Sequence, residues 1–520
     1  MIKEKIKKSE ACLLVNDKRL LNIPPYITGV TISDTVESIL PLAFSHHVTN
    51  FTVSPNNKNY SSSDDGRILF NKDKTVLITY PSATGNITIP DSVTSIGEDA
   101  FSRCSSLTSV TIGNNVTSIG YSAFDGCRSL TSVIIPDSVI EICEEVFYNC
   151  DSLTSVTIGA GVTKIGEKAF CVCNNLTNFT VSPNNKNYSS SDDGRILFNK
   201  DKTVLIAYPS ATGDITIPDS VTSIGDYAFR GCNNLISVTI PDSVTSIGNA
   251  AFAFCKNLAS ITIPDGVISI GDQAFCGCKN LTNVTIPDSM TSIGNGAFMF
   301  CKNLASITIP DGVISIGDHA FDWYENLTYN EYKNGLYLGN SDNPYLALIR
   351  IKDKSITVFE INSKTKIISP EVFTACCNLT NFVLGPNNDF FSTSDDGKIL
   401  FNKNKTVLIA YPSATGDIII PDSVTEIDDF AFEGCSSLTS VTIPNSVITI
   451  GKSVFRNCSS LTSITIPDSV TSIGYEAFCG CCSLTTVNYK GAQEQWEQIS
   501  IGYSNEDLTN ATINYNYTGG

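Results

Sequence analysis

The stretch LISVTIPDSVTSIGNAAFAFCKN, residues 235–257, decides the fold of this chain. Apolar and polar side chains alternate at 238–240, which predicts a short strand with one buried face. The Pro-Asp-Ser run at 241–243 predicts a turn, because proline fixes φ and aspartate bonds its own backbone. A second extended piece at 244–247 ends at a glycine. We expect the following Ala-Phe pair, which ends at Phe252, to lie in a short helical or 3₁₀ turn that returns the chain.

This unit recurs along the chain with a period of 23 residues. A phenylalanine marks each of its 14 copies, and a cysteine follows most of these phenylalanines three residues later. Such a period indicates a stacked array in which each copy is one structural repeat. The phenylalanines of this column are residues 44, 101, 124, 147, 170, 229, 252, 275, 298, 321, 373, 432, 455 and 478.

One unit is too small to bury its own apolar side chains, so neighbouring units must stack to seal a shared core. The sequence therefore predicts a β-rich solenoid of parallel strands with short helical or 3₁₀ turns, interrupted by antiparallel hairpin insertions. We expect an N-terminal cap over residues 1–26, the solenoid over 27–486, and a C-terminal cap over 487–520.

Four insertions interrupt the period. They span residues 51–85, 179–213, 329–361 and 382–416. The first two are near copies that differ only at Thr79 and Ala207, and the last is a more divergent copy. In the first copy, the strand-like runs 67–70 and 75–80 flank a polar turn, which predicts a β-hairpin that projects from the solenoid. The insertion at 329–361 is different in sequence but also contains two strand-like runs.

The chain carries 34 basic and 52 acidic residues, for a formal net charge of −18. This charge disfavours nucleic acids and anionic membrane surfaces as partners, because both bind basic faces. There is no run of the roughly 18 apolar residues that a membrane span needs, so we do not expect membrane insertion. The basic N-terminal segment leads into a short apolar run, Ala11 to Val15, which does not reach the length of a signal-peptide core.

The repeated unit I-P-D-S-V-T-S-I-G-x-x-A-F-x-x-C-x-x-L-T-S-V-T closely resembles the BspA-like leucine-rich repeat, also called the Treponema pallidum type. The resemblance covers about residues 27–486, and the insertion at 51–85 is similar to a module of the same family. The tail from Gln493 to Tyr515 resembles the terminal cap of bacterial members. The resemblance implies a surface or secreted microbial protein, because members with an assigned role adhere to host proteins, host cells or other microbes. The family has no shared catalytic residues.

The chain has 19 cysteines, and 12 of them occupy the one repeat column. We expect buried free thiols there, since a small and weakly polar side chain suits a core position. Disulfides between stacked neighbours are the alternative, although the odd total argues against complete pairing. Pairs such as Cys276-Gly-Cys278 lack the C-x₂-C spacing of structural zinc sites. With three histidines and no catalytic or phosphate-binding motif, we expect no metal, no cofactor and no enzyme activity.

Two surfaces are candidates for ligand contact. The outward strand positions predict a flat hydroxyl-rich face made by Ser109, Thr111, Ser237, Thr239, Ser260, Thr262, Thr285 and Thr308. The hairpins offer aromatic and basic side chains at Tyr60, Arg67, Tyr188, Arg195 and Tyr345. The alternatives are a solvated strand face or an ice-ordering threonine array for the hydroxyls, and packing over the solenoid edge for the aromatics. Aspartates that follow proline, such as Asp242, either form the turn or line up as an acidic edge for a basic partner or divalent cations.

The sequence therefore predicts a non-catalytic binding scaffold, namely a monomeric microbial adhesin at the cell surface or secreted. Its partner would be a protein or a glycan on a host or neighbouring cell, held by many weak contacts. The alternative is an intracellular or injected scaffold for protein–protein interaction, located in the cytoplasm.

Overall fold

The computed structural model describes residues 15–16, 19–20, 23, 26–40, 43–44, 47–323 and 326–519. Most of the expected N-terminal cap lies outside these residues. The chain forms two compact units with an interleaved boundary. The first holds residues 1–284, 296–304 and 322–326, and the second holds 285–295, 305–321 and 327–520.

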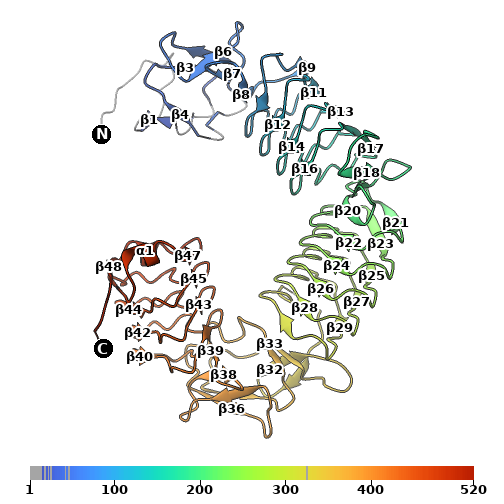
Figure 1. The fold of residues 1–520 in the computed structure, drawn as a ribbon. Helices are drawn as coiled ribbons and strands as arrows, with labels where there is room; N and C mark the ends of the chain where they lie inside the picture. Colours follow the sequence, from blue (N-terminus) through green and yellow to red (C-terminus); the bar gives the residue numbers. More distant parts are fainter. Residues whose placement is uncertain are drawn as a thin grey trace. The chain divides into compact units, whose positions relative to one another are not determined.

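In the first unit the chain winds as a flattened coil, with one strand of each turn on either side (Figure 1). Residues one turn apart are paired in parallel, as Val133 with Val156 and Ile119 with Ile142. The longer strands are β9 (Gly85–Thr88), β11 (Leu107–Thr111), β13 (Ser132–Ile135), β15 (Ser155–Ile158) and β17 (Asn178–Val181). The short strands are β10 (Ser95–Ile96), β12 (Ser118–Ile119), β14 (Glu141–Ile142) and β16 (Lys164–Ile165). The predicted parallel solenoid is confirmed.

The same two ladders resume after the second insertion. The first unit continues with β21 (Gly213–Thr216), β23 (Leu235–Thr239) and β25 (Ser260–Thr262), and with β22 (Ser223–Ile224), β24 (Ser246–Ile247) and β26 (Ser269–Ile270). β27 (Asn283–Thr285) ends in the second unit, which also holds β28 (Ser292–Ile293), β29 (Ser306–Ile307) and β30 (Ser315–Ile316). Its last turns contain β40 (Gly416–Ile419), β42 (Leu438–Thr442) and β44 (Ser463–Ile466), with β41 (Glu426–Ile427), β43 (Thr449–Ile450) and β45 (Ser472–Ile473).

The core of each turn is closed by the column phenylalanine. Phe101 and Phe124 are buried and stack face to face, with ring centroids 4.9 Å apart and an interplanar angle of 3°. Phe229 and Phe252 stack at 4.8 Å, and Phe252 and Phe275 at 5.4 Å. The same side chain at the same position of successive turns therefore builds an aromatic stack within each run of turns.

The corner that contains the Ala-Phe pair is not the helical or 3₁₀ turn that we expected. The residues two before and two after the phenylalanine have left-handed backbone, with φ of 53° at Asp99 and 61° at Arg103. The N–H groups of Asp99, Phe101 and Arg103 donate to carbonyls of the next turn, at 2.9, 2.8 and 2.6 Å. A helix would satisfy these groups within one turn, whereas here they extend the turn-to-turn ladder around the corner.

Three of the insertions form a three-stranded antiparallel meander and do not project as isolated hairpins. In the first, β6 (Tyr60–Ser62) pairs with β7 (Leu69–Asn71), which pairs with β8 (Val76–Thr79). β8 then pairs in parallel with β10, so the insertion starts the next short-strand ladder. The reason is that Leu77 is fully buried and continues the core. The copies are β18 (Tyr188–Ser190), β19 (Leu197–Asn199) and β20 (Val204–Ala207), and β37 (Phe391–Thr393), β38 (Leu400–Asn402) and β39 (Val407–Ala410).

The insertion at 329–361 has an unrelated sequence but forms the same arrangement. β31 (Asn330–Tyr332), β32 (Gly335–Leu338) and β33 (Ala347–Ile351) pair antiparallel, and β33 pairs in parallel with β35 (Ile367–Ile368). β34 (Val358–Ile361) and β36 (Asn381–Leu384) form the neighbouring long-strand pair. Near the N-terminus, β3 (Gly29–Ile32) pairs with β5 (Asn50–Val53), and β1 (Val15–Asn16), β2 (Arg19–Leu20) and β4 (Ser38–Ile39) form a small sheet.

The C-terminal segment covers the last turn of the second unit. β47 (Ser500–Ile501) pairs with β45, and β48 (Thr512–Asn514) pairs with β46 (Thr486–Tyr489). The short helices α1 (Gln493–Trp496) and α2 (Glu506–Thr509) bury Trp496 and Leu508 against the core. In the part of the chain that the structure describes, no helix has the length and apolar character required to cross a membrane.

Candidate functional site

The outward face of the long strands presents hydroxyl groups in rows. Ser237 lies beside Ser260, and Thr239 beside Thr262, one turn apart in parallel register. Both threonines are exposed, and no hydrogen bond from another described residue engages their hydroxyls. Apolar neighbours on the same strands, such as Val238, point into the core. Side chains alternate between the two faces of a strand, so each outward position of the strand adds one row of hydroxyls that runs from turn to turn.

The other predicted residues of this face have similar settings. Thr111 is exposed on β11, whereas Ser109 donates its hydroxyl hydrogen to Asn86 Oδ1 at 3.1 Å. In the second unit, Thr285 ends β27 and Thr308 follows β29, and both are exposed. The structure thus places all the predicted hydroxyls on the outward face of the long strands.

The predicted hairpin tyrosines serve mainly to anchor the insertions. Tyr60 is half-buried, and its hydroxyl donates to the Glu37 carbonyl at 3.4 Å. Tyr188 accepts the Ile165 N–H at 3.0 Å. Burial raises the pKa of both phenols. These contacts favour the packing alternative for both tyrosines.

The remaining hairpin candidates differ in accessibility. The Arg67 guanidinium lies over the Tyr80 ring at 5.2 Å, and Tyr345 packs against Tyr337 with ring centroids 5.6 Å apart. Arg195 is exposed and lies 3.9 Å from Asp193. Of the five hairpin candidates, Arg195 therefore presents the most accessible side chain.

The aspartates after proline both form the turn and lie exposed along one edge. The Val139 N–H donates to the Pro136 carbonyl at 3.1 Å and closes the turn around Asp137. Asp137 also accepts the Ala160 N–H of the next turn at 2.6 Å. Asp242 and its equivalents are exposed. Their carboxylates therefore form an acidic edge even though they also shape the turn.

The column cysteines are buried free thiols wherever the structure describes them. The Cys127 Sγ donates to the carbonyl of Phe101, one turn earlier, at 3.2 Å. The Cys255 Sγ likewise donates to the carbonyl of Phe229 at 3.1 Å. Burial raises the pKa of Cys127 well above its usual range. The repeat position of these cysteines predicts their burial but not this hydrogen bond.

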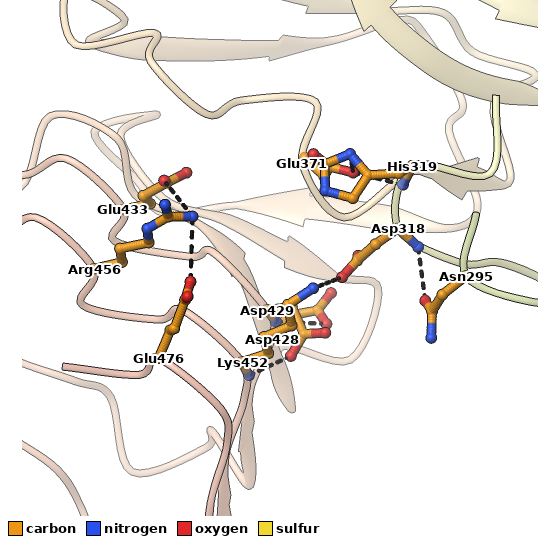
Figure 2. A network of polar contacts seen from close by, with 10 residues as sticks. All are labelled: Asn295, Asp318, His319, Glu371, Asp428, Asp429, Glu433, Lys452, Arg456 and Glu476. Carbon is orange, nitrogen blue, oxygen red and sulfur yellow. Dashed lines mark hydrogen bonds and ion pairs between the residues drawn. The ribbon is translucent and has the colours of Figure 1, made fainter. Parts of the chain in front are cut away.

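Figure 2 shows a polar cluster of the second unit that joins residues 134 positions apart. The Lys452 Nζ pairs with Asp318 Oδ2 at 2.8 Å, and Asp318 is almost completely buried. The Lys452 backbone N–H donates to Asp429 Oδ1 at 2.6 Å. His319 Nδ1 lies 2.8 Å from Glu371 Oε1. No local sequence pattern pointed to this cluster, because its members come from different turns.

The electrostatics of this cluster are set by burial. Desolvation raises the pKa of Asp428 to about 7, and it also raises the pKa values of Asp318 and Asp429. The Asp318 Oδ1 is buried without a hydrogen-bond partner among the described residues. Lys452 already neutralises Asp318, so the geometry supports a structural cluster that is sensitive to pH.

A corner edge of the first unit carries exposed aromatic side chains that the sequence analysis did not single out. Phe254 is 38% exposed and Trp323 is 65% exposed. Both lie two residues after a column phenylalanine, a position that is commonly glycine or asparagine, as at Gly126 and Asn149. Comparing the units column by column would have revealed this difference.

Stacked 23-residue turns with parallel ladders and buried leucines, such as Leu107 and Leu130, define a leucine-rich-repeat solenoid. The family model of the BspA type leucine-rich repeat region matches in six copies, over residues 79–191, 208–330 and 410–518. These segments make up more than half of the chain, which therefore belongs to this family.

Several solved structures of bacterial repeat proteins are similar to this chain. A leucine-rich repeat protein from Bacteroides ovatus is 25% identical, with 88% of this chain and 97% of that one covered, at a TM-score of 0.32. One from Eubacterium ventriosum is 24% identical, with 81% and 94% covered, at 0.33. A leucine-rich cell surface protein from Faecalibacterium prausnitzii is 21% identical, with 85% and 97% covered, at 0.28. No curated protein sequence matches the chain significantly, so the family assignment rests on the repeat itself.

Proposed function

We propose that this chain is a non-catalytic binding scaffold that acts as an adhesin, displayed on a microbial cell or secreted. The observation that carries the proposal is the outward face of the long strands, where Thr239 and Thr262 of adjacent turns expose neighbouring hydroxyls. A face that repeats with every turn offers many equivalent weak contacts, so binding strengthens with the number of turns engaged and with clustering of copies. We propose that a monomer contacts a protein or a glycan on a host or neighbouring cell.

The location is tested by protease treatment of intact cells that produce the chain with a C-terminal tag. Loss of the tag from intact cells is the expected result. Protection of the tag until the cells are lysed would contradict surface display.

The contact face is tested with the paired substitutions Thr239→Glu and Thr262→Glu. Binding to an array of immobilised matrix glycoproteins and glycans should fall at least tenfold. The matched control places the same charges on exposed threonines before the short strands, with Thr222→Glu and Thr245→Glu. Equal losses in the two variants would refute the outward face as the contact surface.

One observation favours a second candidate, an intracellular or injected scaffold for a protein partner. Cys377 and Cys482 are exposed free cysteines, and exposed thiols persist most readily in a reducing compartment. The protease experiment separates the two candidates, because an intracellular scaffold is protected in intact cells.

A further inference from the structure

We propose that one edge of the first unit is a docking strip for an acidic peptide segment that carries aromatic or other apolar side chains. The strip has an aromatic column, Phe254, Phe300 and Trp323, and a lysine row, Lys256, Lys279 and Lys302. This inference rests on the proposed function as a binding scaffold and adds a particular surface and a class of partner.

The backbone gives no reason for aromatic residues in this column. Phe254, Phe300 and Trp323 have φ of 60°, 62° and 63°, a left-handed conformation that favours glycine or asparagine. Equivalent positions hold Gly126 and Gly434. Phe254 and Trp323 are also exposed, so local folding does not explain these large apolar side chains, which favours a role in contact with a partner.

Contacts within the first unit hold the aromatic column in place. The Phe254 ring covers Gly277, where an added Cβ would lie 2.7 Å from Phe254 Cδ1. Phe300 stacks on Trp323 with ring centroids 5.8 Å apart. Phe300 also packs, with Tyr227 and Met299, against a small buried cluster that consists of Ala250, Ala253 and Cys276. The rings are thus held in place before any partner arrives, which lowers the entropic cost of binding.

The lysine row runs alongside the aromatic column. Phe254 and Lys256 flank the buried Cys255 and both are exposed. Lys256, Lys279 and Lys302 follow one another by one turn, which places their backbones about 4.8 Å apart. Neither Lys256 nor Lys279 makes an ion pair with any residue that the structure describes. On a chain with a net charge of −18, Lys256 and Lys279 form a local positive surface.

A hollow adjoins the strip, where the insertion at 179–213 separates Phe170 from Phe229. Its volume is about 210 Å³, and its lining includes Phe170, Ile206, Tyr227 and Arg230. The Arg230 guanidinium lies over the Tyr227 ring at 5.8 Å and over the Phe254 ring at 4.9 Å, so it joins the hollow to the aromatic column. The hollow has room for one apolar side chain of a partner.

These features together specify the occupant. The aromatic column and the hollow favour apolar side chains, and the lysine row favours carboxylates. An extended peptide alternates its side chains between two sides, so it can direct both kinds at the strip at once. The lysines would contribute mainly to orientation and association rate, and the aromatic contacts mainly to residence time. The charged side chains in the lining of the hollow balance, with Glu167 and Asp226 against Lys168 and Arg230, so the hollow itself does not select an anionic ligand.

The full chain supplies its own probe of the strip. It contains two tryptophans, of which Trp323 is exposed and Trp496 is buried. Quenching by acrylamide therefore reports mainly on Trp323. A seven-residue peptide of alternating Glu and Phe should protect Trp323 in a saturable manner, whereas the Lys-Phe counterpart should not. Protection by neither peptide, or equally by both, would overturn the proposal, as would protection by phosphatidylserine vesicles or a single-stranded oligonucleotide but not by the Glu-Phe peptide.

Variants then separate the two parts of the strip. Lys256→Ser with Lys279→Ser should weaken Kd for the Glu-Phe peptide at least tenfold and reduce its salt dependence. Phe254→Gly places a residue found elsewhere in this column and should cause a similar loss with the fold intact. The matched control, Lys58→Ser with Lys186→Ser, removes two exposed lysines of the insertions and should change Kd less than twofold. If both lysine double variants lose the same affinity for the Glu-Phe peptide, the effect comes from net charge alone and the docking strip is refuted.

The docking strip and the surface adhesin can be refuted independently of each other. The peptide measurement does not depend on where the chain is located or on the hydroxyl face. If the Glu-Phe peptide does not bind while the Thr239 and Thr262 variant still loses adhesion, the strip is wrong and the scaffold proposal stands. If the strip binds the peptide but the tag is protected in intact cells, the surface location is wrong and the strip stands.

Discussion

At the scale of single residues, the column cysteine combines two demands that few side chains meet together. Its position is fully buried, as at Cys255 and Cys278, so it must be compact and apolar. It also faces a backbone carbonyl of the previous turn, and the thiol donates to that oxygen at 3.1 Å in both cases. A weak donor with an apolar body suits this site better than a hydroxyl or a hydrocarbon.

Removing the donor should therefore cost more than loss of volume alone. We expect Cys255→Ala to lower the free energy of unfolding of the first unit by about 1–3 kcal/mol, because it leaves a cavity and removes the bond to the Phe229 carbonyl. Cys255→Ser keeps a donor and should cost less than Cys255→Ala. Urea denaturation of both variants checks the order, and a serine variant no more stable than the alanine variant would show that the hydrogen bond has no role.

The same burial predicts which thiols react. Desolvation raises the pKa of Cys104 to about 12 and that of Cys150 well above its usual range, so neither forms a thiolate at neutral pH. An aromatic disulfide reagent should label the exposed Cys377 and Cys482 in the native protein and all 19 cysteines after unfolding. Peptide mapping identifies the labelled positions. Rapid labelling of Cys150 in the native protein would contradict the burial of the column cysteines.

At the scale of the element, the corner depends on close backbone contact between turns. The glycine that ends most short strands approaches the previous turn, and at Gly271 an added Cβ would lie 2.6 Å from the Asn249 nitrogen. The left-handed residues of the corner cost about 1 kcal/mol each outside such a framework. Hydrogen bonds from turn to turn, such as Phe101 N–H to the Ala123 carbonyl, hold this conformation in place.

The close contact makes this glycine the sensitive position of the turn. We expect Gly271→Ala to destabilise the first unit by about 1–3 kcal/mol, because the added methyl group meets backbone atoms that cannot move independently. Gly29→Ala is the control, since its Cβ would have no atom within 4 Å. Thermal unfolding of the two variants measures the difference. A Gly271→Ala variant as stable as the control would show that the turns separate easily.

At the scale of the whole molecule, long-range polar contacts appear where turns distant in sequence meet within one unit. In the second unit, Asp318 and Lys452 come from turns on either side of two insertions, and Asp428 lies among the same carboxylates. Asp428 occupies the position that is glycine in most turns, so it brings a carboxyl group into a crowded site. Because burial raises the pKa of this carboxyl group, the stability of the second unit depends on pH.

The sign of this dependence follows from the raised pKa values. Asp428 holds its proton up to about pH 7 in the folded chain and loses it near 3.8 when unfolded, so the folded state binds more protons between these values. Stability of the second unit should therefore fall as pH rises from about 4 to 7, by up to about 1.4 kcal/mol per pH unit from this group. Unfolding midpoints measured across this range check the prediction.

Substitution identifies the group responsible. Asp428→Asn removes the titrating carboxyl and should flatten part of the pH profile, while Asp422→Asn, in an exposed turn, should leave it unchanged. The raised pKa values of Asp318 and Asp429 act in the same direction and account for the slope that remains. An unchanged profile in Asp428→Asn would assign the pH dependence elsewhere.

The repeat made much of the fold predictable. The 23-residue spacing of residues such as Phe101 and Phe124 implied the parallel stack, and the alternation in β11 and β23 implied which side chains point outward. The corner conformation was not predictable, since a period states how often a turn recurs but not its backbone angles. The Asp318–Lys452 pair was missed for a different reason: it joins two turns through space, and nothing in either turn alone encodes the other.

The pairing of similar turns within each uninterrupted run has a consequence for the gene. Loss or gain of 23 codons within a run of turns gives each residue at the junction an equivalent neighbour from another turn, so we expect the stack to tolerate a change in length that would destroy a globular domain. Near-identical stretches of DNA also recombine unequally. Length thus becomes a heritable variable that changes in steps of about 4.8 Å, and the exposed face lengthens or shortens with it.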